Sequence, residues 1–594
     1  MQNIKSKIFF ALAVLAVVLV TAYTSNFDHN TWWHLSSGRE LSVGMSIPQY
    51  DNFSYAGPTA WKTRGWLFDA FIYSTSTYLK IEMLFLVKIF MLAAFFYIIV
   101  LTVFKRLKGK YMTVVFPVLA MAYFLLQPAF TLSPHMFSFL FAAFFIYALE
   151  HEPSKRHMGL YLSMPLAALV WANMNNSAVL GIVLMLIYLV YHFDSTTEIR
   201  EKNTDISYPI FLGALVATSM VVLVNPEGYR AIILFFSENL KPSALHKSIN
   251  DPVVFGMSDV VFTGVFYSYA ILMLLAIWYN LRGADIGRKA ELFKDILLIA
   301  VPFFAAVFYK EFMPYFIILT VGVFCYYLQL IFKWDMVWEK KWTEAQVSGI
   351  SRTILLLLSP LLFLYAGLEY INAKPVAYPN GAVKYIMRIK PNANIFAPAN
   401  WNGFLEDQLY PRYKTMLTGR NNIENKTAKD YLKIINADPE ALKTCEEYNI
   451  NTFILPPDCA LARVLQNSPK FKPAYFDGTD IIFVNKEKTE QYLTAYNIFD
   501  GKNPYPLGTK AAYEELNEFA QNYPSETAYL ALGTVYAKIN APEAIEFLRD
   551  IVMRYPEYTG LYDFIGKLYY EQKDYKTAIN MWKKNPKKKH ILAH

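Results

Sequence analysis

The stretch from Ser25 to Leu35 brings one carboxylate, two imidazoles and two indoles together directly after the first apolar run of the chain. Asp28 supplies the carboxylate, and Trp32, Trp33 and His34 follow it closely. Indole rings favour the boundary between membrane and water. A carboxylate at that boundary can act as a general base or a metal ligand. Asp28 is therefore the candidate catalytic residue, with a solvated loop aspartate as the alternative.

Side chains that could bind a phosphate lie in the same loop and in other turns expected on the same side of the membrane. Lys62 and Arg64 flank Thr63 between two tryptophans, and ammonium and guanidinium groups are common phosphate ligands. They could equally anchor the chain at the interface. Lys310 and Glu311 could likewise simply neutralise each other. The candidates for binding a phosphate are His34, Lys62, Arg64, His135, Arg230 and Lys310.

The composition is typical of a polytopic membrane protein with a soluble portion. Of the 594 residues, 55% are hydrophobic, 17% are aromatic and only 18% are charged, with a mean hydropathy of +0.23. The net charge of +8 comes mainly from short loops between apolar runs, so no nucleic-acid partner is expected. The chain has no nucleotide-binding glycine loop, no His-Glu-x-x-His helix and no Gly-x-Ser-x-Gly turn.

The apolar runs predict about eleven transmembrane helices, each about 20 residues long. Their centres are Leu15, Phe95, Leu119, Phe144, Leu166, Leu184, Val216, Met273, Phe303, Gly322 and Leu362. Lysine and arginine concentrate in alternate loops, which the positive-inside rule assigns to the cytoplasm together with the N-terminus. The first run could instead be a cleaved signal peptide, but Thr21–Thr24 is a poor cleavage site, so an uncleaved anchor is favoured.

Three domains are expected from this pattern. Residues 1–372 form the transmembrane domain, which includes a long first outer loop at 24–80. Residues 373–490 form a small extracytoplasmic α/β domain, and residues 491–594 form helical repeats. Predicted strands in the α/β domain are Asn394–Ala397, Lys414–Leu417, Thr452–Leu455 and Asp480–Val484, and predicted helices are Ala382–Ile389, Ala428–Ile435 and Pro439–Glu447. Cys445 and Cys459 could pair outside the cytoplasm.

The C-terminal helices repeat with the period of tetratricopeptide units. Leu532-Gly533-x-x-Tyr536 returns as Ile565-Gly566-x-x-Tyr569, and a further helix is expected at Lys510–Asn522. Alternating small and large residues at this period are typical of paired antiparallel helices. Such repeats either bind a protein partner or cap the α/β domain, and both alternatives stay open.

Several motifs, in order along the chain, resemble a family of bacterial membrane proteins in the GT-C glycosyltransferase superfamily. Asp28-x-Asn30-x-Trp32-Trp33-His34-Leu35 is similar to that family's Asp-x-Asp-x-Trp-Trp-His-Leu. The matching segments that follow are Gly44–Tyr55, Trp61–Leu67, Leu169–Asn173, Asn225–Arg230 and Trp401–Arg420. The resemblance implies a mainly helical GT-C-like fold and a polyprenyl-phosphate-linked sugar as donor. Asp28 would then be the catalytic residue, and Arg64, His135 or Lys310 would stabilise the departing lipid phosphate.

Three positions depart from the family pattern, because Asn30, Gly65 and Asn175 replace acidic or imidazole side chains. A divalent metal bound by Asp28 stays an alternative, but the paired carboxylates that would hold such a metal are not expected, and no other cofactor is implied. Two hypotheses result. The first is a glycosyltransferase on the outer face of the bacterial inner membrane, with its C-terminal domains in the periplasm and membrane lipid around it. The second is a catalytically degenerate scaffold that assembles an envelope complex through its α/β and tetratricopeptide domains.

Overall fold

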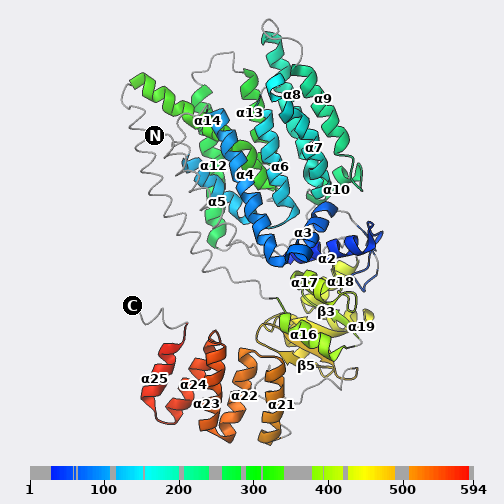
Figure 1. The fold of residues 1–594 in the computed structure, drawn as a ribbon, viewed down its shortest axis with the longest axis vertical. Helices are drawn as coiled ribbons and strands as arrows, with labels where there is room; N and C mark the ends of the chain where they lie inside the picture. The colour runs from blue at the N-terminus through cyan, green and yellow to red at the C-terminus, as the bar shows by residue number, and fades with distance from the viewer. Residues whose placement is uncertain are drawn as a thin grey trace. The chain divides into compact units, whose positions relative to one another are not determined.

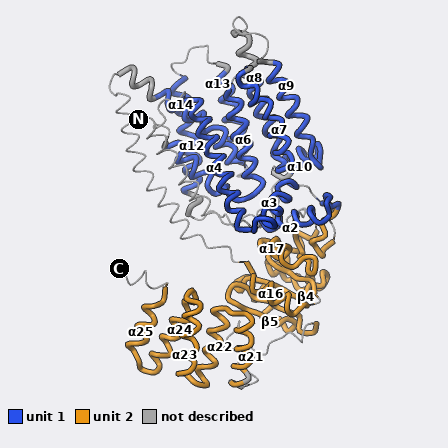
Figure 2. Tube along the Cα trace, viewed as in Figure 1, with its two compact units in different colours: residues 1–49, 61–375 blue, residues 50–60, 376–594 orange. Residues whose placement is uncertain are grey.

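The computed structural model describes residues 29–57, 59–61, 65–107, 116–151, 154–199, 207–239, 257–281, 289–308, 312–339, 378–391, 393–418, 426–488 and 508–586. They divide into two units (Figure 2). Unit 1 contains residues 1–49 and 61–375, and unit 2 contains residues 50–60 and 376–594. The short segment 50–60 thus belongs with the C-terminal part of the chain, although its neighbours on both sides belong to unit 1.

The described part of unit 1 is built from helices (Figure 1). Nine of the predicted run centres lie in helices, whereas Leu15 and Leu362 lie outside the described residues. The nine helices are α4 Leu84–Arg106, α5 Phe116–Leu126, α6 Pro134–Leu149, α7 Met158–Met174, α8 Val179–Ile199, α9 Ser207–Val221, α12 Met257–Leu281, α13 Lys289–Phe308 and α14 Met313–Glu339. The other helices of this unit are α2 His29–Gly44, α3 Trp66–Leu79, α10 Arg230–Asn239 and the 3₁₀ turns η1 Ile81–Met83, η3 Gln127–Ala129, η4 Lys155–His157 and η5 Asn176–Ala178.

Helix α14 is the centre of unit 1, because it packs against α4, α5, α6, α12 and α13. In the most apolar stretch of α14, 78% of the residues are buried within the protein, whereas the corresponding share is 33% in α4 and 33% in α12. The outward faces of α4 and α12 carry exposed large apolar side chains such as Phe90 and Trp278. Apolar surfaces of this kind suit a lipid environment.

Three described segments are long and apolar enough to cross a membrane, namely Ile81–Arg106, Val261–Leu281 and Met313–Ile331. Five further apolar helices of the described part are shorter. These candidate spans, with apolar side chains turned outward, are the features of a membrane protein.

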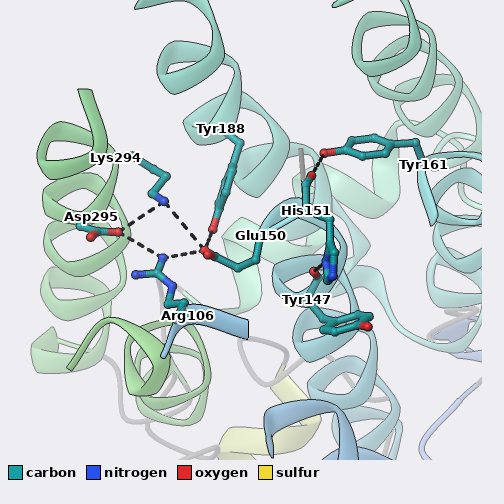
Figure 3. A network of polar contacts seen from close by, with 8 residues as sticks. All are labelled: Arg106, Tyr147, Glu150, His151, Tyr161, Tyr188, Lys294 and Asp295. Atoms are coloured by element: carbon teal, nitrogen blue, oxygen red, sulfur yellow. Dashed lines mark hydrogen bonds and ion pairs between the residues drawn. The ribbon is translucent and has the colours of Figure 1, made fainter. Parts of the chain in front are cut away.

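A buried network of charges joins four helices of unit 1 (Figure 3). The Arg106 guanidinium at the end of α4 donates to Glu150 after α6, at 2.6 Å, and to Asp295 of α13, at 3.1 Å. The Lys294 ammonium lies 3.7 Å from Asp295 and 3.9 Å from Glu150. The Tyr188 hydroxyl of α8 donates to Glu150. Two cations and two anions, each side chain at most 10% exposed, thus balance one another.

Unit 2 contains a four-stranded mixed sheet. Its strands are β3 Asn394–Phe396, β4 Ile450–Leu455, β5 Phe471–Phe476 and β6 Ile481–Asn485, in the order β3-β4-β6-β5. The β3 and β4 pair is parallel, and the other two pairs are antiparallel. The surrounding helices are α16 Asn380–Ile389, α17 Ala399–Leu409, α18 Lys426–Ile435, α19 Ala441–Glu447 and α20 Ala460–Asn467. Three of the predicted strands and all three predicted helices are confirmed.

The sequence prediction differs from the structure at four places in this sheet region, one of which is helix α20, which was not predicted. Lys414–Leu417 is not a sheet strand, since only Thr415 pairs, in an isolated parallel bridge with Ser54. Strand β5 was not predicted because Pro473 interrupts it, and proline is tolerated there because β5 is an edge strand. Helix α17 was not predicted because its asparagines and Gly403 have low helix propensity. Cys445 and Cys459 are free thiols.

The C-terminal part of unit 2 is a series of antiparallel helices (Figure 1). They are α21 Gly508–Asn522, α22 Glu526–Ile539, α23 Ala541–Arg554, α24 Thr559–Glu571 and α25 Tyr575–Lys584, and each packs against the next. A Cβ atom on Gly533 would press into Leu548, and one on Gly566 would overlap the Trp582 ring. The repeated glycines therefore permit close approach of the helices within each pair.

Asp480, just before β6, is a buried carboxyl in this unit. Its side chain is fully buried, and neither of its oxygens has a hydrogen-bond partner among the described residues. Burial, with a smaller contribution from the Asp477 carboxylate, raises the pKa of Asp480 to about 8. The folded state therefore retains a proton that the unfolded chain releases near pH 4.

We predict that Arg106→Ala destabilises the full chain by about 3 to 5 kcal/mol, because it leaves two buried carboxylates without their guanidinium. Lys105→Ala removes an exposed cation one residue earlier and should cost less than about 0.5 kcal/mol. Thermal unfolding in detergent measures both. Equal stabilities for the two variants would contradict a stabilising role for the network.

The raised pKa of Asp480 also leads us to predict that the free energy of unfolding depends on pH. Because its pKa is raised on folding, its contribution to stability is full below about pH 4 and is lost as the pH rises through about 8. Asp480→Asn, which mimics the protonated carboxyl, should therefore be more stable than the native chain at pH 8 and nearly equal to it at pH 4. Asp458→Asn, at an exposed position, is the control. A constant difference across this range would show that Asp480 does not titrate this way.

Candidate functional site

Helices α2 and α3 are held so closely that their backbones touch. A Cβ atom on Gly38 of α2 would overlap the carbonyl of Asp69 in α3, so only glycine fits at this position. Gly38 lies one helical turn after His34 and therefore on the same face of α2. The close approach brings the His34 side chain to the Asp69 carboxylate.

His34 and Asp69 form a hydrogen-bonded pair. The distance from His34 Nδ1 to Asp69 Oδ1 is 2.5 Å, and the side chains are 21% and 7% exposed. The imidazole also stands edge-on to the Phe68 ring, with centroids 4.9 Å apart. A carboxylate that is hydrogen-bonded to Nδ1 fixes the orientation of the imidazole ring. The pair can thus transfer a proton or donate to an anion.

Polar contacts link the α2 and α3 region to the ends of three further elements. The Trp66 indole donates to Asn173 at the end of α7, at 2.7 Å, and the Asn173 amide donates to the Val224 carbonyl after α9, at 2.9 Å. The Thr31 hydroxyl of α2 donates to the Leu132 carbonyl before α6, at 3.4 Å. All these groups lie at the end of unit 1 that carries α2 and α3.

The predicted His135 lies at this same end of unit 1. It is exposed at the start of α6, and its Nδ1 lies 3.5 Å from the Asn175 amide. Arg230 is also exposed and begins α10, which packs against η5 directly after Asn175. The structure therefore gathers His34, His135 and Arg230 at one end of the helical unit, opposite the Arg106 network, because His135 lies in the first turn of α6 and Glu150 directly follows its last residue.

The remaining predicted site residues lie outside the described part of the chain. Asp28 directly precedes α2, Lys62 and Arg64 fall between Trp61 and Gly65, and Lys310 falls between α13 and α14. Their roles stay predictions. The described residues contain no group of three or more histidine, cysteine, aspartate or glutamate side chains that could hold a metal ion.

Asp69 is a candidate site residue that the sequence analysis did not name. The family pattern has an acidic residue just before Trp66, where this chain has Gly65, and no carboxylate is therefore expected there from the sequence. The structure supplies a carboxylate from Asp69, one turn later on α3. A signal was available, since an aspartate inside the apolar Trp66–Leu79 helix is costly to bury without a partner.

The packing of α2 on α3 generates a prediction. Gly38→Ala should separate the two helices and break the His34–Asp69 pair, because backbone atoms cannot move aside as a flexible side chain can. Gly44→Ala is the matched control on the same helix, since its Cβ atom would have only the Ser46 hydroxyl nearby, at 3.7 Å. We expect a loss of about 1 to 3 kcal/mol for the first variant and a negligible change for the second. Equal unfolding temperatures would contradict the packing.

No protein-family model and no curated protein sequence matches this chain. Among solved structures, the chain is similar to the archaeal oligosaccharyltransferase AglB from Archaeoglobus fulgidus in complex with an inhibitory peptide and a dolichol-phosphate. The identity is 11%, the match covers 90% of this chain and 86% of that chain, and the TM-score is 0.52.

Two further structures of the Archaeoglobus fulgidus oligosaccharyltransferase also match. One carries a tethered acceptor peptide, with 10% identity, coverage of 75% and 69%, and a TM-score of 0.49. The other contains Zn and sulfate, with 10% identity, coverage of 91% and 86%, and a TM-score of 0.48. The comparison with the first structure shows that the fold of this chain is similar to that of the archaeal oligosaccharyltransferase.

Proposed function

We propose that this protein is a GT-C-type glycosyltransferase that moves a sugar from a polyprenyl-phosphate-linked donor to an acceptor on the outer face of the bacterial inner membrane. The observation that carries the proposal is the likeness in fold, over most of both chains, to an oligosaccharyltransferase solved with dolichol-phosphate. The order of the sequence motifs supports the same conclusion independently of the fold.

Asp28 acts as the general base in this proposal. It takes the proton from the acceptor while the acceptor atom forms a bond to the anomeric carbon of the sugar. The bond between that carbon and the phosphate oxygen breaks, and polyprenyl phosphate leaves with the electron pair. Positive charge develops on the sugar and negative charge on the leaving phosphate, so catalysis depends on side chains that stabilise both.

Cationic and imidazole groups stabilise the leaving phosphate. Lys62, Arg64 and Lys310 are the proposed ammonium and guanidinium ligands, and Arg230 adds a further positive charge. His34 and His135 donate hydrogen bonds, with His34 oriented by Asp69 at 2.5 Å. The arrangement that supports these roles is the concentration of His34, His135 and Arg230 at one end of unit 1.

A divalent metal forms no step in this mechanism. The position that would supply a second carboxylate is Asn30, and the Asp69 carboxylate is bonded to His34. Asparagine is a weaker, neutral oxygen ligand, so this donor set does not fit a site that relies on paired carboxylates.

A second function, as a scaffold for an envelope protein complex, is favoured by helices α21–α25. The glycines at Gly533 and Gly566 lie 33 residues apart in the sequence and play the same packing role in successive helix pairs. This supports a tetratricopeptide-like array, and such arrays present surfaces to protein partners. The two functions are compatible in one chain, but only the first requires Asp28.

The test is Asp28→Asn in cells that depend on the full chain. We expect transfer of sugar from the lipid-linked pool to envelope glycan to fall at least about 100-fold, because the amide cannot accept the proton. Mass spectrometry of both pools measures this. Glu82→Gln is the control, since Glu82 is an exposed carboxylate near the same end of unit 1.

A chain truncated before Thr509 separates the two functions. Normal envelope glycan in Asp28→Asn cells, together with loss of growth in cells that carry the truncated chain, would contradict the transferase and support the scaffold. Loss of glycan in Asp28→Asn at normal protein level supports the transferase.

A further inference from the structure

Two of the sequence motifs meet in unit 2, although they are more than 350 positions apart. One is the segment 50–60 of the first outer loop, in which β1 Tyr50–Asp51 pairs with β2 Thr59–Ala60 as an antiparallel hairpin. The other is the segment 410–418 after α17, which we call the strap. The segment and the strap together form what we call the joint.

Main-chain hydrogen bonds connect the two segments. The Tyr55 amide donates to the Thr415 carbonyl, and the Thr415 amide donates to the Phe53 carbonyl, each at 3.1 Å. Ser54 and Thr415 pair as in a parallel sheet. Segment 50–60 thus pairs with the strap through its backbone, and this pairing fixes the register of the two segments.

Buried side chains add specificity to the joint. The Thr418 hydroxyl donates to Asp51 Oδ2 at 2.5 Å, and the Phe53 amide donates to Asp51 Oδ1 at 3.0 Å. The Ser54 hydroxyl donates to the Met416 carbonyl at 2.7 Å. Asp51 is 0% exposed, so the loss of a donor would leave a buried carboxylate poorly solvated.

Helix α17 holds the strap from its other side. The Asn402 amide donates to the Leu417 carbonyl at 3.0 Å, and the Thr415 hydroxyl donates to Glu406 at 3.0 Å. Both α17 side chains are buried. The Phe53 ring packs against Tyr410, with centroids 4.6 Å apart. The joint is therefore part of the folded core of unit 2.

The chain leaves unit 1 and returns to it at one point. Gln49 precedes the segment and Trp61 follows it, and the Trp61 amide donates to the Gln49 carbonyl at 2.9 Å. In the sequence, Lys62 and Arg64 come directly after Trp61. Helix α2, which follows Asp28, ends five residues before Gln49. The residues that flank segment 50–60 are thus hydrogen-bonded to each other, directly before the proposed phosphate-binding residues in the sequence.

We propose that the joint allows unit 2 to position the first outer loop. Asp51 and Thr418 are then positioning residues for the transfer reaction. The effect on catalysis rests on the proposed function. The joint itself does not, because it stands on contacts within unit 2. Loss of the Asp51–Thr418 bond would free segment 50–60, which directly precedes Trp61 and the stretch of sequence that carries Lys62 and Arg64.

Thr418→Val tests the proposal, since it removes the hydroxyl at nearly constant volume, and Thr418→Ser is the matched control that retains it. Hydrogen exchange of the full chain should be about tenfold faster at the Tyr55 and Thr415 amides in the valine variant, with β4 amides unchanged. The serine variant should behave as the native chain. Ser54→Ala, which removes one hydroxyl contact to the strap, provides a milder variant if the valine variant does not fold.

Sugar transfer in the same cells, assayed beside Asp28→Asn, separates the two claims. The proposal predicts a drop of about tenfold or more in Thr418→Val and rescue in Thr418→Ser. Faster exchange with normal transfer in Thr418→Val, while Asp28→Asn is inactive, would overturn the positioning role and leave the proposed function intact. Normal transfer in Asp28→Asn would overturn both the function and the positioning role. Unchanged exchange in Thr418→Val would overturn the joint.

Discussion

Pairing of charged and polar side chains among apolar helices is the constraint on which the helical unit depends. Where α4, α6, α8 and α13 meet, Arg106 satisfies two carboxylates that would otherwise be buried and unpaired. At the other end of the unit, Asp69 is satisfied by His34. The same physical requirement thus has two results. One end of the unit is closed by a charge network that balances internally, while the other end retains imidazoles and a guanidinium that are partly or fully exposed.

The two ends of the helical unit therefore differ in their ability to bind an anionic ligand. Buried ion pairs that balance one another are costly to break and offer little to a ligand. Exposed cations and oriented imidazoles suit an anionic group such as a phosphate. The proposed reaction lies at the end with the exposed groups, and the segment 50–60 connects that end through the chain to the folded core of unit 2. In the proposed reaction, unit 1 supplies the side chains that bind the phosphate, and unit 2 holds segment 50–60.

The sequence predicted the fold more fully than the site. Long apolar runs located nine helices of unit 1, because burial or lipid contact demands continuous apolar faces. Strands such as β4 were predictable from their β-branched and aromatic residues, whereas β5 contains Pro473 and α17 contains Gly403, and both defeat local propensity. The pairing of His34 with Asp69, and that of Asp51 with Thr418, join residues 35 and 367 positions apart. No local pattern specifies such contacts, and only Asp69 gave a hint, as a carboxylate within an apolar helix.

The most direct test of the central claim is an experimental structure of the full chain in lipid nanodiscs with polyprenyl phosphate added. The account predicts density for the phosphate beside Asp28, in contact with Lys62 and Arg64, at the end of the helical unit that carries α2 and α3. Density for the phosphate at the opposite end near Arg106, or a lipid-free region beside Asp28 at saturating ligand, would contradict it.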